Sequence, residues 1–152
     1  MRMRDFVVRD AINPDLKADA KEQVIREMVD GLRLANALKG EQADDIVKAI
    51  LKRELLGSTG IGRNVAIPHA KHPSIDRLVG ALAVSKTGVG FESLDGEPVF
   101  VFVMLISPQD RPGDHLRALE NVSRCLRDEG FVKALRQAPT REAIWDLLGE
   151  QE

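Results

Sequence analysis

An uninterrupted apolar run near the middle of the chain constrains the fold more than any other feature of the sequence. The run "VFVFVMLI", residues 99–106, is rich in valine and contains no charged residue. It is far too short to cross a bilayer, but it has the length and composition of a strand that is buried on both faces. A sheet with such a strand needs cover on both faces, which helices elsewhere in the chain can provide.

Helical periodicity is visible in two segments that precede this run. Residues 19–38 carry apolar side chains three and four positions apart, at Val24, Ile25, Met28, Val29 and Leu32. Residues 41–57 repeat the pattern at Ile46, Val47, Ile50 and Leu51. We expect Asp19 and Glu22 to cap the first helix, and we expect Gly57 to end the second.

The remaining periodic segments complete the expected architecture. Residues 78–85 read as a second buried strand, joined to the apolar run by the turn "LDGEP". A helix is predicted over residues 112–128, with an inward stripe at His115, Leu119, Val122 and Leu126. Shorter helices are predicted over 131–136 and over 140–148, the latter capped by Thr140 and buried at Ile144, Leu147 and Leu148. The sequence therefore predicts an α/β fold, one mixed sheet flanked by helices, in a single domain over residues 1–152.

Composition excludes several classes of function. The chain has 22 basic and 24 acidic residues, which leaves no excess of cations for a nucleic-acid backbone. The N-terminus "MRMRDFVVRDAI" has charges where a signal peptide needs apolar residues, and Cys125 is the only cysteine. We therefore expect a cytoplasmic protein with no membrane insertion, no internal disulfide and no multi-cysteine metal site.

The segment "GSTGIGRNVAIPHAKH", residues 57–72, contains three glycines and two of the three histidines of the chain. A dinucleotide-binding loop would have to follow a strand and open a helix, but here a helix comes before the glycines and a proline follows them. A metal site formed by His69, His72 and His115 is also disfavoured, because prolines on both sides of the first pair prevent an ordinary helix. We expect neither a cofactor nor a metal ion.

Phosphoryl transfer through a histidine suits this segment better. Such a reaction needs a neutral nucleophile and donors for the phosphoryl oxygens, because positioning and electrostatics supply most of the catalysis. Glycines allow backbone N–H groups to come close, while Ser58 and Thr59 add hydroxyl donors. Arg53 continues the apolar stripe of the preceding helix, and its guanidinium can hold a phosphoryl group through two hydrogen bonds.

Three separated motifs, "RELLGSTGIGRNVAIPHAK", "FESLDGEPVFVFVMLISP" and "HLRALENVSRCLRD", occur in an order that resembles a known family. This is the mannitol/fructose-type IIA domain of the bacterial phosphoenolpyruvate-dependent phosphotransferase system, and the similarity is greatest to its nitrogen-regulatory members. The resemblance covers nearly the whole chain and is strongest over residues 53–119. Arg63 and Asn64 depart from it, because the family usually has a glycine at this point.

The resemblance implies a role for several residues. His69 would accept a phosphoryl group from a histidine phosphocarrier protein, HPr or its nitrogen-branch counterpart, with Arg53 and His115 beside it. Ser58, Thr59 and Gly60 would bind the phosphate. His115 lies near a helix N-terminus, where the protonated form is disfavoured, so we expect it to be neutral. His72 has no counterpart in the family, and we expect it on the surface.

Two functions stay open at this point. The protein could be a regulator whose partners distinguish its phosphorylated form from its free form. It could instead be a sugar-specific subunit that passes the phosphoryl group to a IIB component of a permease. A chain of 152 residues without an attached IIB or membrane segment favours the regulator.

Overall fold

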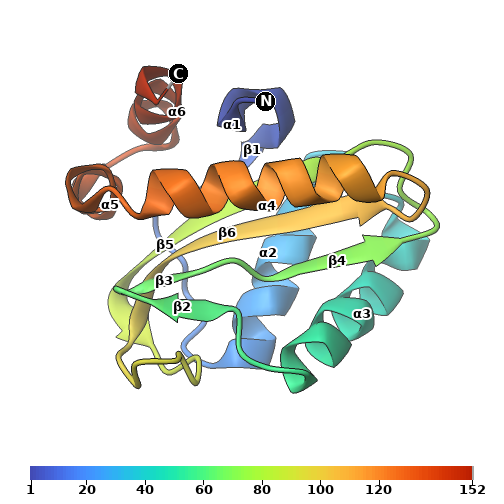
Figure 1. The fold of residues 1–152 in the computed structure, drawn as a ribbon, viewed down its shortest axis with the longest axis horizontal. Helices are drawn as coiled ribbons and strands as arrows, with labels where there is room; N and C mark the ends of the chain where they lie inside the picture. Colours follow the sequence, from blue (N-terminus) through green and yellow to red (C-terminus); the bar gives the residue numbers. More distant parts are fainter. Residues whose placement is uncertain (152) are drawn as a thin grey trace.

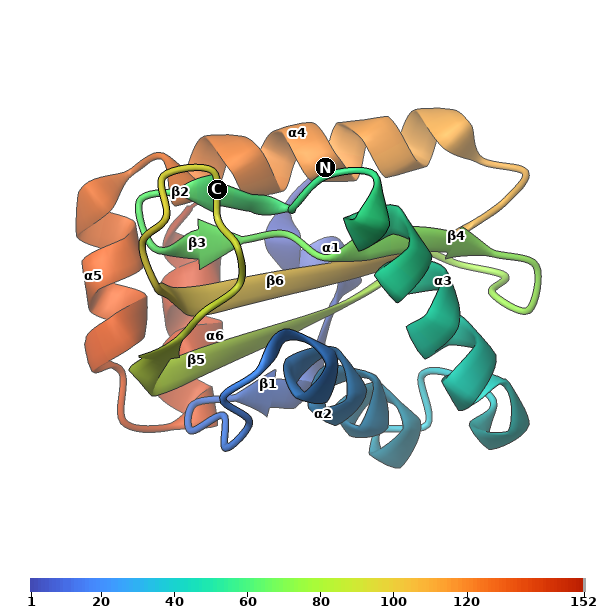
Figure 2. The same cartoon turned by 90° about the horizontal axis from the view of Figure 1, so that it is seen from below.

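The computed structural model describes residues 1–151 and shows one mixed sheet between two layers of helices (Figures 1 and 2). The strands are β1 (Val7–Asn13), β2 (Gly60–Gly62), β3 (Val65–Ala66), β4 (His69–His72), β5 (Val79–Val89) and β6 (Val99–Pro108). The helices are α1 (Met3–Phe6), α2 (Lys21–Leu34), α3 (Ala43–Leu55), α4 (Pro112–Leu126), α5 (Glu129–Gln137) and α6 (Arg141–Glu150), with a 3-10 turn, η1, at Gly40–Gln42. The predicted fold class is confirmed.

Strand β6, which contains the apolar run, lies at the centre of the sheet. The strand order is β1-β5-β6-β3-β2, and β4 also pairs with β6. Alternate side chains of β6 enter two separate cores, because successive residues of a strand point to opposite faces. Val101, Val103 and Leu105 pack with the α4, α5 and α6 side of the molecule. Phe102, Met104 and Ile106 pack with the α2 and α3 side.

Strands β3 and β4 run parallel to β6 along the same edge of it, separated by Ile67 and Pro68. The backbone N–H of Leu105 donates to the carbonyl of Pro68, and His69 pairs in register with Leu105. Along β4, the even-numbered residues are buried, whereas His69 is half-buried and Lys71 is exposed. The central strand therefore fixes the backbone of His69 while its side chain faces the α4 side of the sheet.

The sequence placed α2 to α6 correctly but missed some of their ends, and it did not predict α1. All five predicted core residues of α2 are buried, yet the N-cap is Ala20 and no side chain caps the helix, so the cap predicted at Asp19 and Glu22 is wrong. Thr140 is confirmed as a cap, because its hydroxyl accepts a hydrogen bond from the backbone N–H of Ala143. Strand β1 was not predicted. Within residues 1–151, no helix combines the length and apolar character that a bilayer crossing requires.

Candidate functional site

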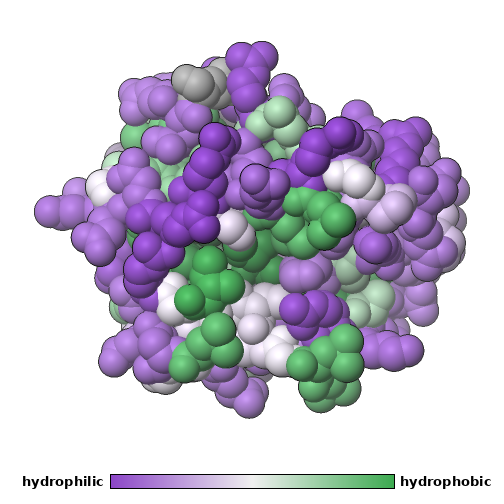
Figure 3. Space-filling view, viewed as in Figure 1, coloured by the Kyte–Doolittle hydropathy of each residue, from purple (hydrophilic) through white to green (hydrophobic). Residues whose placement is uncertain are grey.

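Side chains from three elements meet at one pocket of about 520 Å³. Arg53 comes from the last turn of α3, His69 begins β4, and His115 lies in the first turn of α4. Leu56 and Leu116 also line the pocket, and they are 84% and 65% exposed. Figure 3 shows this face of the molecule, with apolar surface over α4 and at the C-terminal end of α3. The structure thus brings together the three residues that the sequence predicted to act together.

The imidazole of His69 is held through one of its two nitrogens. Its Nδ1 lies 2.7 Å from the carbonyl oxygen of Ile67. A carbonyl only accepts hydrogen bonds, so Nδ1 carries the proton and Nε2 keeps its lone pair. Within the described chain, Nε2 has no hydrogen-bond partner. Burial is the main cause that lowers the pKa of His69, and the nearby Arg53 charge lowers it further. His69 is therefore neutral at pH 7, with a free nucleophilic nitrogen.

His115 packs against His69 and is almost fully buried. The ring centroids of the two imidazoles are 5.4 Å apart, with an angle of 56° between their planes. The Nδ1 atom of His115 lies 2.5 Å from the hydroxyl oxygen of Ser107, which is itself completely buried at the end of β6. Burial and then the neighbouring His69 lower the pKa of His115 to about 4. This agrees with the neutral form expected from its position in the helix.

Arg53 is oriented by the loop that follows α3. Its Nη1 donates to the carbonyl of Gly57 at 2.9 Å. The adjacent Glu54 is buried, and its carboxylate accepts two hydrogen bonds from the backbone N–H of Thr59, at 3.0 and 3.2 Å. The ammonium of Lys21 lies 3.1 Å from the same carboxylate. Glu54 therefore ties the start of the glycine-rich segment to the end of α3 and to the start of α2.

The glycine-rich segment packs against the loop between β5 and β6. The hydroxyl of Ser58 donates to the carbonyl of Phe91 and accepts from the N–H of Gly60. A β-carbon on Gly60 would lie only 2.9 Å from the Cα of Ser93, so the close approach of this loop requires a glycine there. The hydroxyl of Thr59 is buried and has no hydrogen-bond partner in the described chain. None of Ser58, Thr59 and Gly60 lines the His69 pocket, and their role as phosphate ligands stays a prediction.

The prediction that His72 lies on the surface is wrong, because only 4% of this residue is exposed. Alternation along β4 points it to the face opposite His69, where α3 covers it. Its Nδ1 accepts from the backbone N–H of Ser74 at 3.1 Å, so its Nε2 donates to the Oδ2 of Asp45 at 2.5 Å. His69 and His72 therefore cannot bind one ion together. Within residues 1–151, no three side chains of metal-binding type cluster.

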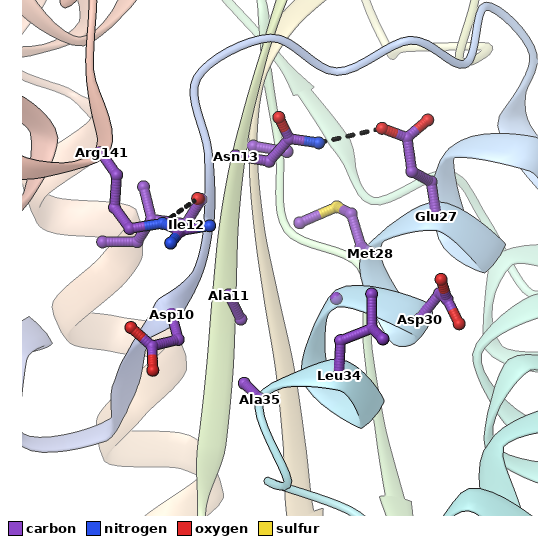
Figure 4. A pocket seen from close by; sticks show the side chains of 12 residues that line it. Asp10, Ala11, Ile12, Asn13, Glu27, Met28, Asp30, Leu34, Ala35 and Arg141 are labelled. Carbon is purple, nitrogen blue, oxygen red and sulfur yellow. Dashed lines mark hydrogen bonds between the residues drawn. The ribbon is translucent and has the colours of Figure 1, made fainter.

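A further pocket of about 440 Å³ lies at the opposite edge of the sheet, between β1, α2 and α6 (Figure 4). Several of its polar side chains form hydrogen bonds to other groups of the protein. The amide of Asn13 donates to the carboxylate of Glu27, and the Nε of Arg141 donates to the carbonyl of Ile12. No histidine lines this pocket, so we do not assign it a part in phosphoryl transfer.

Comparison with known proteins points to one family. The model described as "Phosphoenolpyruvate-dependent sugar phosphotransferase system, EIIA 2" matches residues 5–151. A nitrogen regulatory protein of Bradyrhizobium diazoefficiens is 36% identical over 148 residues, which cover 97% of this chain and 95% of that protein. The fructose-specific EIIABC component of Bacillus subtilis is 37% identical over the whole of this chain, which corresponds to 24% of that longer protein.

Solved structures agree with these sequence comparisons. The nitrogen regulatory protein IIA-Ntr from Neisseria meningitidis superposes with a TM-score of 0.86 at 27% identity, and the match covers 95% of this chain and 97% of that one. The mannitol IIA protein of Escherichia coli superposes with a TM-score of 0.76 at 21% identity, over 91% of this chain and 96% of that one. At that identity the second likeness shows the fold alone.

Proposed function

The chain belongs to the EIIA type-2 family of the phosphoenolpyruvate-dependent phosphotransferase system, and on this premise we propose that it is a phosphoryl-carrier and regulatory protein. It accepts a phosphoryl group on His69 from a histidine phosphocarrier protein in the cytoplasm and signals through its phosphorylation state. One observation carries the proposal. The Nδ1 of His69 is occupied by the Ile67 carbonyl, so the free Nε2 is left in a pocket with Arg53 and His115.

The step is a transfer between two imidazoles. The lone pair on the Nε2 of His69 attacks the phosphorus, and the bond from phosphorus to the donor nitrogen breaks, with its electron pair staying on the donor. The His69 ring gains positive charge as the new bond forms, while Nδ1 keeps its proton. The Ile67 carbonyl, 2.7 Å from Nδ1, stabilises that charge. No proton has to leave the pocket during the transfer.

Arg53 and His115 supply what the phosphoryl oxygens need. The guanidinium of Arg53 offers several donors in one plane, of which the Gly57 carbonyl takes one. When the Ser107 hydroxyl donates to the Nδ1 of His115, the proton of this neutral ring is on Nε2. That N–H can donate a hydrogen bond to a phosphoryl oxygen. The low pKa of His115 keeps this ring neutral, so it donates without adding a positive charge beside His69.

Two observations support a regulatory role: the sequence similarity to a nitrogen regulatory protein over nearly its whole length, and the exposed apolar surface around His69. The similarity to the Bradyrhizobium nitrogen regulatory protein covers nearly all of both chains. Leu56 and Leu116 line the His69 pocket and are exposed, so a partner that covers this face gains apolar contact. Phosphorylation adds a charge of about −1.5 to −2 to that face. A partner without basic residues would bury that charge at high cost, and it is expected to bind only the unmodified form.

A sugar-specific IIA role is the second candidate, favoured by the 37% identity to the fructose-specific EIIABC component. In that case the phosphoryl group passes to a IIB component. A complex of mannitol IIA with phosphorylated mannitol IIB from Escherichia coli has a IIA chain of this fold, with a TM-score of 0.77 at 20% identity.

Mass spectrometry tests phosphoryl acceptance directly. The protein is incubated with phosphoenolpyruvate, enzyme I and the phosphocarrier of its own organism, and we expect one acid-labile, base-stable phosphoryl group on His69. A folded His69→Ala variant should gain none. Undiminished labelling of that variant would show that His69 is not the phosphoryl acceptor.

Affinity capture separates the two candidates. Unphosphorylatable His69→Ala protein and enzymatically phosphorylated parent protein serve as baits in cytosol from the source organism. We expect at least one regulatory target that the first bait retains and the second releases. Recovery of only the phosphocarrier and a IIB protein by both baits would replace the regulatory role with the sugar-transfer role.

A further inference from the structure

A third pocket, of about 600 Å³, lies where the turn between β2 and β3 meets α5. Figures 1 and 2 both show this turn beside α5, at the end of the sheet away from the C-terminus of β4. It is lined by Arg63, Asn64, Leu126, Glu129, Val132, Lys133, Arg136 and Gln137. None of these residues lines the His69 pocket, so this hollow needs an explanation of its own.

The charges around this pocket, which we name the α5 pocket, are unbalanced. Arg63, Lys133 and Arg136 face Glu129 as the single carboxylate of the lining. Within residues 1–151, none of the three cations forms an ion pair. Arg26 and Arg33 of α2 pair with acidic neighbours, whereas Arg77, like the three cations of this pocket, is in no ion pair within the described chain. Three cations against one carboxylate leave a local positive potential that attracts an anion.

Arg63 is held in this place at a conformational cost. Its φ is 56° and that of Asn64 is 69°, so two consecutive residues other than glycine adopt the left-handed region. The turn is fixed by hydrogen bonds from the Arg63 N–H to Asp95 and from the Asn64 amide to the Pro98 carbonyl. A glycine would adopt this conformation without strain, whereas the arginine brings a side chain that lines the pocket and whose Nη1 donates to the Arg127 carbonyl at 3.4 Å.

Arg136 is also oriented in advance. Its guanidinium carbon lies 3.8 Å from the centre of the Phe100 ring, stacked over the aromatic face. Stacking uses the face of the guanidinium and leaves the N–H groups on its edge for an acceptor. Lys133 lies one helical turn away on α5, so both cations project from the same side of that helix.

We propose that the α5 pocket binds an organic phosphate with two or more negative charges, of the size of a nucleoside diphosphate. The guanidinium groups of Arg63 and Arg136 match the geometry of phosphate oxygens, and Lys133 adds a further charge. The pocket is much larger than one phosphate group, and its lining also includes the apolar Leu126 and Val132, which are 1% and 8% exposed. This site is separate from phosphoryl acceptance by His69.

Isothermal titration calorimetry at constant ionic strength tests the proposal, with ADP, inorganic pyrophosphate and uncharged adenosine as probes. We expect saturable binding of ADP, weaker binding of pyrophosphate and none of adenosine. Arg63→Gly and Arg136→Gln should each weaken ADP binding by about tenfold or more. Arg63→Gly also keeps the turn, because glycine accepts its positive φ. The matched control is Arg77→Gln, which removes an exposed cation outside the pocket and should bind ADP like the parent.

The result that overturns the proposal is equally specific. Binding that weakens as much in Arg77→Gln as in the pocket variants is general charge attraction, and unchanged binding in the pocket variants places ADP elsewhere. Absence of ADP binding alongside capture of single-stranded RNA or anionic vesicles also rejects a small-molecule site. His69→Ala should bind ADP like the parent, which keeps this test independent of the proposed phosphoryl transfer.

Discussion

His69 and His72 lie three residues apart on one strand, but the protein treats them in opposite ways. His72 is buried against α3, with Asp45 on one ring nitrogen and Ser74 on the other. Among the described residues, His69 has one hydrogen-bond partner, the Ile67 carbonyl, and it is half-buried on the other side of the strand. The difference shows how a short strand can give one imidazole a structural role and leave the other free to react.

The choice of partner decides what each ring can do. A carboxylate on Nε2 and a donor on Nδ1 use both nitrogens of His72, so neither is available as a nucleophile. A carbonyl on Nδ1 of His69 fixes the tautomer but leaves Nε2 unprotonated. The same comparison predicts that substitutions on the two sides of β4 should separate stability from phosphoryl transfer.

The largest expected contrast is between His69→Gln and His72→Gln. His69→Gln should lose phosphoryl acceptance completely at nearly parental stability. His72→Gln should still accept the group, but its free energy of unfolding should fall by about 1–3 kcal/mol, because buried partners lose their hydrogen bonds. Single-turnover labelling and urea unfolding measure the two effects. Loss of transfer in a folded His72→Gln protein would contradict the separation.

His115 should make stability depend on pH in a defined window. Its pKa is about 4 in the folded protein against 6.5 in the unfolded chain, so between these values only the unfolded chain binds a proton. The free energy of unfolding therefore falls as the pH drops through this range, by about 2 kcal/mol from pH 7 to pH 5. Urea unfolding at both pH values should show a smaller loss in His115→Gln than in the parent. Equal losses would mean that His115 titrates normally.

Arg53→Lys, in the His69 pocket, should slow phosphoryl transfer less than His69→Gln does. Lysine keeps the positive charge but cannot make two parallel hydrogen bonds to one phosphoryl group. We expect single-turnover transfer to slow by about tenfold without a change in stability. Lys48→Gln, which alters a cation of the same helix outside the pocket, is the control and should transfer at the parental rate. A parental rate in both variants would leave Arg53 without a part in transfer.

The smallest expected effect is that of Ser74→Ala on the His72 side. The backbone N–H of Ser74 still donates to His72, so only the hydroxyl contact at 2.7 Å is lost. The free energy of unfolding should fall by about 0.5–1 kcal/mol, and phosphoryl transfer should be unchanged. A slowing of transfer comparable to that of Arg53→Lys would show that the two faces of β4 are coupled.

Local patterns predicted the long elements well, because each long helix buries one face and the apolar runs of β5 and β6 are buried on both. The stripes of α2, α3 and α4 and the apolar runs of β5 and β6 all appear where periodicity indicates. The short strands β2, β3 and β4 could not be predicted in this way. Strand β3 has only two residues, and its pairing with β6 depends on partners more than 30 positions away. Such pairing leaves no local periodicity in the sequence.

The sequence predicted which side chains would lie together but not what surrounds them. Arg53, His69 and His115 were identified from the sequence and its resemblance to a family, and the structure brings them to one pocket. Had β4 been identified as a strand, the burial of His72 could have been inferred, because residues two apart on a strand share a face and Ala70 is buried. The phosphate role of Gly60 stays a prediction, and its close approach to Ser93 is a contact that only the folded chain reveals.

If His69 accepts a phosphoryl group as proposed, its place beside β6 makes that acceptance a measure of cooperative folding. β6 is hydrogen-bonded on both edges, by β5 on one side and by β3 and β4 on the other. Its amides should exchange with solvent deuterium only through global opening, because freeing them requires the two cores to separate. Arg53, His69 and His115 come from three segments that this strand and its cover hold together. In a denaturant titration, the fraction of molecules that accept a phosphoryl group should therefore fall together with the protection of the slowest-exchanging amides of β6.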